Sequence, residues 1–386
     1  MAGITVWKTR FPGQMERIAQ CVAQARAQHR MTQGVMEGNI LLVVPSSHTL
    51  QMEMELIRML HLPGLLNLKI LSPANLVTLV REQSGTLDLE PLNERGRCMA
   101  LSEALMELEE AGRLQFYTQV AYQSGLAPKI SELLSEIAMA GYNPQILQEM
   151  SDEAGSVSGA GRMKMQDLSA IWDTYEQLIE PSFLDEPAQW EQMLQQLPAC
   201  GLLRETDLII ACFTTLTRDL CRLSAVAAGG AKSVQIVLMS DSSSGDAHLF
   251  EPAESSLSIL MKEAKDAGAE LIIREDRSDV QRTEALRFLE RHLFSHQQLS
   301  AQAEIPDLQG ISLHFARNTY RETLVVAETL KRWHREGIAW DEMAVLPMAP
   351  EEISSMLSVT LRTAGIPFYL KREDTAMRHG LSHMLL

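Results

Sequence analysis

The stretch that most constrains the fold of this chain runs from Asp207 to Leu223, DLIIACFTTLTRDLCRL, and joins a short apolar run to a turn and a helix. The apolar residues 208–211 are too few for an ordinary helix, and an uninterrupted apolar run is typical of a parallel strand buried on both faces. In open parallel sheets, ligands bind beyond the carboxyl ends of the strands. We therefore expect the functional residues of this chain to follow such strands.

The same unit of strand, turn and helix recurs along the chain. Short apolar runs predict further strands at residues 4–6, 40–44, 68–71, 234–239 and 270–273. Helical periodicity predicts helices at residues 14–29, 49–60, 255–267 and 280–294. Between residues 92 and 197 the strand signal disappears and the sequence becomes helical. Alternating strands and helices predict an α/β fold with a doubly wound parallel sheet, interrupted here by a helical subdomain.

A separate α/β pattern begins near Gly310. Residues 311–347 have the pattern of a strand, a helix and a strand, and a helix at 350–363 and a strand at 367–370 follow. We expect a first domain formed by residues 1–82 with 200–300, an inserted helical subdomain at 83–199, and the start of a second domain at 310–386. The chain stops at Leu386 in an apolar-periodic segment without a cap signal, so we expect it to be truncated.

Charge and cysteine usage exclude several classes of protein. Lys and Arg number 34 against 50 Asp and Glu, which gives a net charge of −16 and argues against binding nucleic acid by overall charge. The net charge does not exclude a basic groove on one part of the surface. The five cysteines are scattered without a zinc-binding pattern, so we expect reduced thiols, no metal and no cofactor. Apolar runs fall short of the roughly 20 residues that span a bilayer, and we expect a cytoplasmic protein without membrane contact.

A degenerate nucleotide site is suggested by the first predicted turn. Residues 8–15, KTRFPGQM, lie where a phosphate-binding G-x-x-x-x-G-K-[ST] loop would lie, with Lys8 first and Gly13 in the last glycine position. Gln14 and Met15 then stand where the Lys and Ser/Thr would contact phosphates and magnesium. A neutral amide and a thioether supply neither contact. Taken alone, an ordinary turn between a strand and a helix is the favoured interpretation.

Two other strand ends bear on nucleotide chemistry. In P-loop NTPases an acidic residue that holds magnesium ends the strand equivalent to residues 208–211, whereas this chain has Ala211 and Cys212. Asp241 follows the predicted strand 234–239 at the expected ligand crevice, although a polar turn residue is the favoured interpretation. Ser46 and Ser47 precede the helix predicted at 49–60, where either could cap the helix or contact a phosphate.

Longer segments carry a resemblance to a known family. The segments ILLVVPSSHTLQMEMEL, NLKILSPANL, DLIIACFTTLTRDL, FARNTYRETLVVAETLKRW and AVLPMAPEEISSMLSVTLRTAGIPFYL resemble the AddB/RexB family, the inactivated helicase-like subunits of bacterial helicase-nucleases. The resemblance implies two RecA-like domains as in superfamily I helicases, the first split by a helical subdomain. It also implies an AddA-like helicase-nuclease partner that consumes ATP during double-strand-break repair.

The resemblance assigns roles to further positions. In active helicases an Arg that touches the γ-phosphate follows the strand that corresponds to residues 344–346, where this chain has Met348. By resemblance, the candidates for facing single-stranded DNA are Ser46, Ser47, His48, Ser72, Thr214 and Thr215. Each could equally be only a cap or turn residue. The family's carboxyl-terminal nuclease and its iron-sulfur cluster have no counterpart here, and we expect no catalytic residue.

Three hypotheses follow. The first is a catalytically inactive helicase-like module that guides DNA and scaffolds a helicase-nuclease, with weak and salt-sensitive binding to single strands. The second is a working NTPase with an atypical phosphate loop that uses Lys8, Arg10 and Asp241, which would lack most of the electrostatic stabilisation of phosphoryl transfer. The third is a protein-interaction module without DNA contact, which is compatible with the charge of −16. We expect no ATP hydrolysis.

Overall fold

The chain divides into two compact units, Met1–Ala303 and Glu304–Leu386. The structure is a computed structural model, and it describes residues 3–370 except 30, 33–34, 37, 63, 86–89, 124, 154–158, 180–182, 241–248, 277–282, 294–305 and 309. Asp241 and the segment from 371 to 386 therefore lie outside the described residues. No helix in the described part of the chain is both long and apolar enough to cross a membrane.

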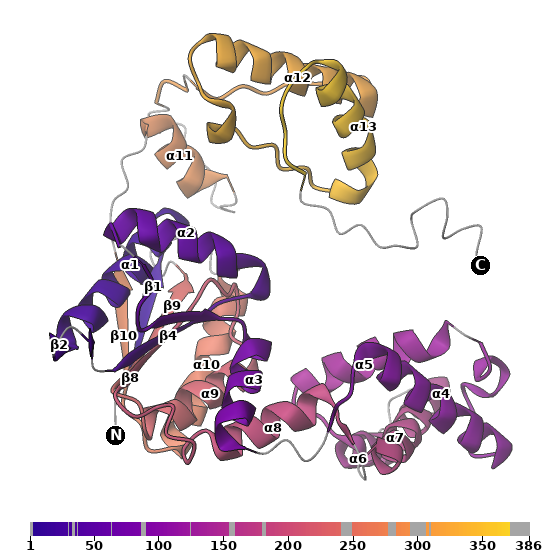
Figure 1. Ribbon diagram of the computed structural model, residues 1–386. Helices are drawn as coiled ribbons and strands as arrows, with labels where there is room; N and C mark the ends of the chain where they lie inside the picture. Colours follow the sequence, from indigo (N-terminus) through magenta and orange to yellow (C-terminus); the bar gives the residue numbers. More distant parts are fainter. Residues whose placement is uncertain are drawn as a thin grey trace. The chain divides into compact units, whose positions relative to one another are not determined.

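A six-stranded parallel sheet forms the centre of the first unit (Figure 1). Its order is β10-β1-β9-β8-β4-β5. The strands are β1 Ile4–Thr9, β4 Asn39–Val43, β5 Leu68–Leu71, β8 Thr206–Ala211, β9 Ser233–Met239 and β10 Leu271–Asp276. All six residues of β8 are buried, as expected of a strand that is covered on both faces. The predicted α/β fold with a parallel sheet is thereby confirmed.

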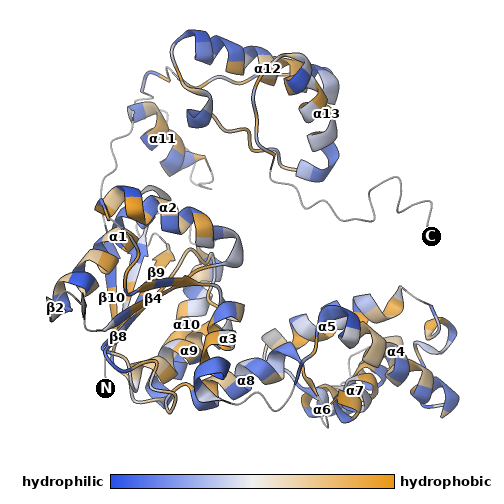
Figure 2. Cartoon of the chain, viewed as in Figure 1, coloured by the Kyte–Doolittle hydropathy of each residue, from blue (hydrophilic) through white to orange (hydrophobic). Residues whose placement is uncertain are grey.

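Helices cover both faces of this sheet, because successive residues of each strand point to opposite sides. Ile40 and Leu42 pack with α1 (Phe11–Gln28) and α2 (Thr49–Leu60) on one face. Leu41 and Val43 pack on the other face. The helices of that second layer are α3 Pro73–Ser84, α8 Glu186–Gln196, α9 Arg218–Ala228 and α10 Glu251–Asp266. Figure 2 shows the sheet strands as largely hydrophobic between these two layers.

The end of the sheet opposite the carboxyl ends is held by a buried pair. His29 follows α1, and its Nε2 lies 2.8 Å from Oδ2 of Asp207 at the start of β8. Ser233 donates its hydroxyl to the other oxygen of Asp207. Gly38 leaves room for the imidazole, because a Cβ on this residue would lie 2.2 Å from His29 Nδ1. These contacts tie α1 to two neighbouring strands.

The helical segment between β5 and β8 has a hydrophobic core of its own. Its helices are α4 Glu94–Glu110, η2 Thr118–Val120, α5 Leu126–Met139, α6 Pro144–Glu153 and α7 Gly159–Ile179. Buried Asp167 on α7 accepts hydrogen bonds from the backbone N–H groups of Gln115, Phe116 and Tyr117, which fixes the loop before η2. A parallel pair, β6 Glu90–Pro91 with β7 Phe183–Leu184, joins the two ends of this segment. Met193 and Leu194 of α8 pack into the core beneath the sheet.

Small elements complete the first unit. They are the antiparallel pair β2 Met31–Thr32 and β3 Val35–Met36, the 3-10 turn η1 Ser46–His48, and the helix α11 Glu284–His292.

The second unit confirms two predicted helices and corrects three predicted strands. The helices are α12 Thr319–Arg335 and α13 Pro350–Thr363, with the 3-10 turn η3 Trp340–Glu342 between them. Residues 311–316, 343–347 and 366–370 form no strand, so the predicted strands there are wrong. A strand requires a neighbour that pairs its backbone N–H and C=O groups, and these segments have no such ladder among the described residues. Two of their large side chains stay exposed, Leu346 by 92% and Tyr369 by 90%.

Candidate functional site: the carboxyl edge of the sheet

The predicted site residues of the first unit gather along one edge of the sheet, because parallel strands end at the same side. The strand order divides this edge into two parts. We call the ends of β10, β1 and β9 the β1 half, and the ends of β8, β4 and β5 the β4 half. The candidate nucleotide residues near β1 belong to the β1 half, and the candidate DNA residues belong to the β4 half.

The turn expected at residues 8–15 is wrong in its extent, because β1 and α1 occupy nearly all of it. Lys8 and Thr9 belong to β1, α1 begins at Phe11, and Arg10 alone separates strand from helix. Gly13, Gln14 and Met15 lie in the first two turns of α1. The backbone N–H of Gly13 donates to the carbonyl of Arg10 over 3.0 Å, so the helix already uses a group that a phosphate cradle would need. Pro12 fits the first turn of a helix as well as a loop, which explains the error.

Lys8 has an internal partner on the opposite side of the sheet from α1. Its Nζ donates to both carboxylate oxygens of Glu254 on α10, over 2.8 and 2.9 Å. Ser240, which follows β9, donates its hydroxyl to the same carboxylate. Lys8 is 11% exposed and Glu254 43%. Burial alone raises the pKa of Glu254, but the hydrogen bonds from Lys8 and Ser240 outweigh it and hold that pKa below its ordinary value.

A second ion pair lies on the α1 side of the same strand end. Arg17 of α1 donates its Nε to Asp276 over 2.6 Å, with side chains 14% and 7% exposed. Asp276 ends β10 and lies in register with Thr9. The guanidinium also stacks on Trp7, 4.2 Å from the ring centroid. The hydrogen bond with Asp276 raises the pKa of Arg17.

Two of the remaining nucleotide candidates, Ala211 and Cys212, are not brought to Lys8. Ala211 ends β8 and Cys212 follows it, and β9 separates this strand from β1. Ala211 is buried against the α1 layer. Cys212 has a left-handed backbone with φ of 65°, and burial raises the pKa of its thiol to about 11. Met348 lies in the second unit with its side chain exposed.

In the β4 half, Ser46, Ser47 and His48 form the exposed turn η1 after β4. The Ser47 hydroxyl lies 3.0 Å from Nδ1 of His48. The expected cap role of the serines is wrong, because His48 occupies the N-cap of α2 and no side chain caps that helix. The turn instead points its polar side chains to solvent.

The other three DNA candidates differ among themselves. Ser72 is buried, caps α3, and accepts a hydrogen bond from the backbone N–H of Asn75 over 3.2 Å. Thr214 is exposed and Thr215 is half-buried, in the connection between β8 and α9. Thr217 caps α9, since its hydroxyl accepts from the N–H of Leu220. Thr214 and Thr215 therefore have no capping role.

Sequence reasoning missed Glu254, Asp276 and Arg17. Glu254 lies 246 positions from Lys8, so no local pattern connects the two. The predicted strand at 270–273 was too short to include Asp276, because Arg274 and Glu275 interrupt its apolar run. A charged residue at the end of a strand was the signal that could have found Asp276.

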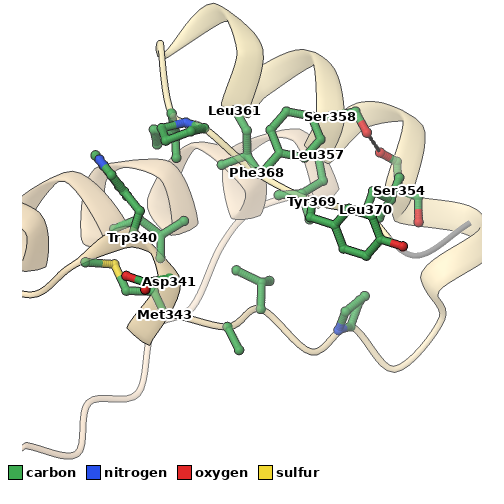
Figure 3. A pocket seen from close by; sticks show the side chains of 16 residues that line it. Trp340, Asp341, Met343, Ser354, Leu357, Ser358, Leu361, Phe368, Tyr369 and Leu370 are labelled. Atoms are coloured by element: carbon green, nitrogen blue, oxygen red, sulfur yellow. Dashed lines mark hydrogen bonds between the residues drawn. The ribbon is translucent and has the colours of Figure 1, made fainter. Parts of the chain in front are cut away.

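A hollow of about 600 Å³ lies within the second unit, between α12, α13 and the extended segments (Figure 3). Its lining is mainly apolar and includes Trp340, Leu357, Leu361 and Phe368. Ser354 and Ser358 are joined by a hydrogen bond along α13. Among the described residues of the chain, no group of three or more His, Cys, Asp or Glu side chains is placed to hold a metal ion.

Comparison with known proteins identifies relatives of the whole fold. The family described as "ADDB, N-terminal" matches residues 17–290. A protein of Desulforamulus reducens is named as a subunit of an ATP-dependent helicase/deoxyribonuclease. It is 24% identical over an alignment 386 residues long, which covers 95% of this chain and 32% of that protein. A protein of Symbiobacterium thermophilum with the same name is 26% identical, over 90% of this chain and 31% of that protein. The chain spans about a third of the length of these curated relatives. It therefore belongs to the family of AddB amino-terminal regions.

Proposed function

We propose that this chain is a helicase-like part of a helicase-nuclease subunit that guides single-stranded DNA without hydrolysing nucleotide itself. An AddA-like partner would supply the ATP-driven movement during double-strand-break repair in the cytoplasm. The observation that carries the proposal is the contrast along one sheet edge. The β1 half, where phosphates would bind, is filled by ion pairs of the chain itself, and the β4 half exposes polar side chains.

The β4 half supports a DNA path through its position and chemistry. β8 and β4 are neighbours in the sheet, so their ends lie about 5 Å apart. The exposed residues after them are Ser46, Ser47, His48 and Thr214, beside the half-buried Thr215. Hydroxyl and imidazole groups can contact phosphates and sugars of a single strand. Ser72 would hold α3 in place, because its hydroxyl is buried and already bonded.

DNA binding tests this proposal. We expect fluorescence anisotropy to show weak binding of single-stranded oligonucleotides, with a log–log salt slope of about −0.7 per phosphate contact. The variant His48→Glu, Thr215→Glu adds two negative charges to the β4 half and should abolish binding. The matched control Gln24→Glu, Gln28→Glu adds the same charge to exposed positions on α1, towards its carboxyl-terminal end. Equal binding by both variants would place the DNA path elsewhere.

Absence of binding even at low salt would favour the protein-interaction module, with which the charge of −16 is compatible. The NTPase hypothesis is tested separately by isothermal titration with ATP and magnesium. We expect no saturable heat, because Lys8 is already engaged by Glu254. Saturable heat that is lost in Lys8→Glu would overturn the proposed nucleotide independence.

A further inference from the structure

Two cations lie on opposite sides of the end of β1, and each is engaged by a carboxylate from a distant part of the chain. Lys8 pairs with Glu254 on the α10 side, and Arg17 pairs with Asp276 on the α1 side. Three of these four side chains are at most 14% exposed. A charge buried to this degree is costly unless a counter-charge accompanies it. The two carboxylates therefore supply what a bound anion would otherwise supply.

The donors around Glu254 are arranged as they would be around an oxyanion. One carboxylate receives Nζ of Lys8 on both oxygens and the Ser240 hydroxyl on one of them. A phosphate group accepts the same types of donor, from ammonium and hydroxyl groups. Thr9 follows Lys8 in β1 and therefore faces the α1 side, where its buried hydroxyl has no hydrogen-bond partner among the described residues and lies in register with Asp276. The α1 side of the strand end thus holds a donor that the carboxylates do not use.

We propose that Glu254 acts as an internal substitute for an oxyanion ligand, so that neutralising it exposes a latent oxyanion site formed by Lys8 and Ser240. This inference rests on the proposed nucleotide-independent function and gives it a structural cause. The site is closed because Glu254 occupies it. It also lacks the Lys and Ser/Thr of a phosphate-binding loop. Arg17 and Asp276 close the other side of the strand end in the same manner.

Thermal unfolding with inorganic phosphate as the probe tests the inference. Glu254→Gln keeps an amide of the same size and removes the charge. We expect its melting temperature to lie below that of the unmodified chain in chloride, and to rise by about 2–4 °C in phosphate at matched ionic strength. The unmodified chain should show no such rise. The double variant Lys8→Gln, Glu254→Gln should show none either, because it lacks the cation.

The control is Glu191→Gln, which removes the partner of Arg222 in another ion pair at 2.8 Å. It should lower the melting temperature without any response to phosphate. A response of the unmodified chain, or no response of Glu254→Gln, would overturn the inference. Should Glu254→Gln not fold in chloride, folding restored by phosphate supports the inference and failure in both salts overturns it. ATP binding by the unmodified chain would instead overturn the proposed function.

Discussion

The two halves of the carboxyl edge share one sheet, but β1 in one half differs from β4 and β8 in the other in the connection between the strand and the next helix. In the β1 half a single residue, Arg10, connects β1 to α1, and the side chains at the strand end are paired and largely buried. In the β4 half, residues 44–48 and 212–217 connect the strands to α2 and α9, and several of their side chains are exposed. At β1, β4 and β8, the short connection accompanies the closed strand end and the longer connections accompany the open ones.

Ser72 supports this rule from within the β4 half. It is the only residue between β5 and α3, and it is buried and bonded as a helix cap. A connection of one residue places the helix start directly on the strand end, where the first N–H groups must be satisfied locally. Longer connections leave room for side chains that can reach a ligand. Substitutions at the closed and the open strand ends should therefore have different effects.

The largest effect is expected for Asp276→Ala. This change leaves the buried guanidinium of Arg17 without its carboxylate, and breaking such a pair costs about 3 kcal/mol of the free energy of unfolding. Urea-induced unfolding measures the loss. The control Glu55→Ala breaks an exposed pair with Arg58 and should cost less than about 1 kcal/mol. Equal losses would show that the β1 half is no more tightly closed than the surface.

A smaller effect with a defined pH dependence is expected for Glu254→Gln. Glu254 is 43% exposed, so solvent screening limits the loss at pH 7 to about 1 kcal/mol. Its pKa is lowered in the folded protein from the ordinary 4.5, so its stabilisation is complete above that value and is lost as the pH falls through the lower folded pKa. Melting temperatures measured from pH 7 to pH 3 should therefore converge for the two proteins below about pH 4.5. A difference in melting temperature that stays the same at every pH would contradict an ion pair between Lys8 and Glu254.

The sequence predicted the six strands of the central sheet because each contains a local apolar run, as in β5, whose predicted bounds were those observed. It predicted strands wrongly at residues 344–346 and 367–370, because local pattern cannot supply the neighbouring strand that a ladder requires. It missed the Lys8–Glu254 pair because the partners are 246 positions apart. The closure of the β1 half depends on contacts between residues that are distant in the sequence, so local pattern does not predict it. The exposed turn after β4 is formed by polar residues that are adjacent in the sequence, so local pattern does predict it.

A chemical effect is expected at Cys212, which directly follows β8, the strand of the β4 half that pairs with the β1 half. Burial raises its thiol pKa to about 11, and the thiolate is the form that reacts with alkylating reagents. We expect iodoacetamide to modify Cys212 slowly at pH 8 and faster as the pH approaches 11. Mass spectrometry of the alkylated peptides measures the rate. Fast modification at pH 8 would show that this strand end is as open as the turn after β4.

The smallest effect on stability is expected for Ser47→Ala in the open half. Ser47 is exposed, so the free energy of unfolding should change by less than about 0.5 kcal/mol. If the DNA path runs here, loss of one neutral hydroxyl contact should weaken single-strand binding by about fivefold, since a hydrogen bond contributes about 1 kcal/mol. Because the hydroxyl carries no charge, the salt slope should stay the same. His48→Glu differs, because a repulsive charge is screened by salt and its penalty should shrink as salt rises.

These two responses can be separated by titrating salt on both variants. The control Thr78→Ala removes an exposed hydroxyl from the middle of α3 and should change neither affinity nor slope. Ser47→Ala binding that equals the control would remove this turn from the DNA path. A salt-independent penalty for His48→Glu would mean that the glutamate disturbs the turn itself, since electrostatic repulsion at an exposed site must fall with ionic strength. Only a penalty that fades with salt places the phosphates beside His48.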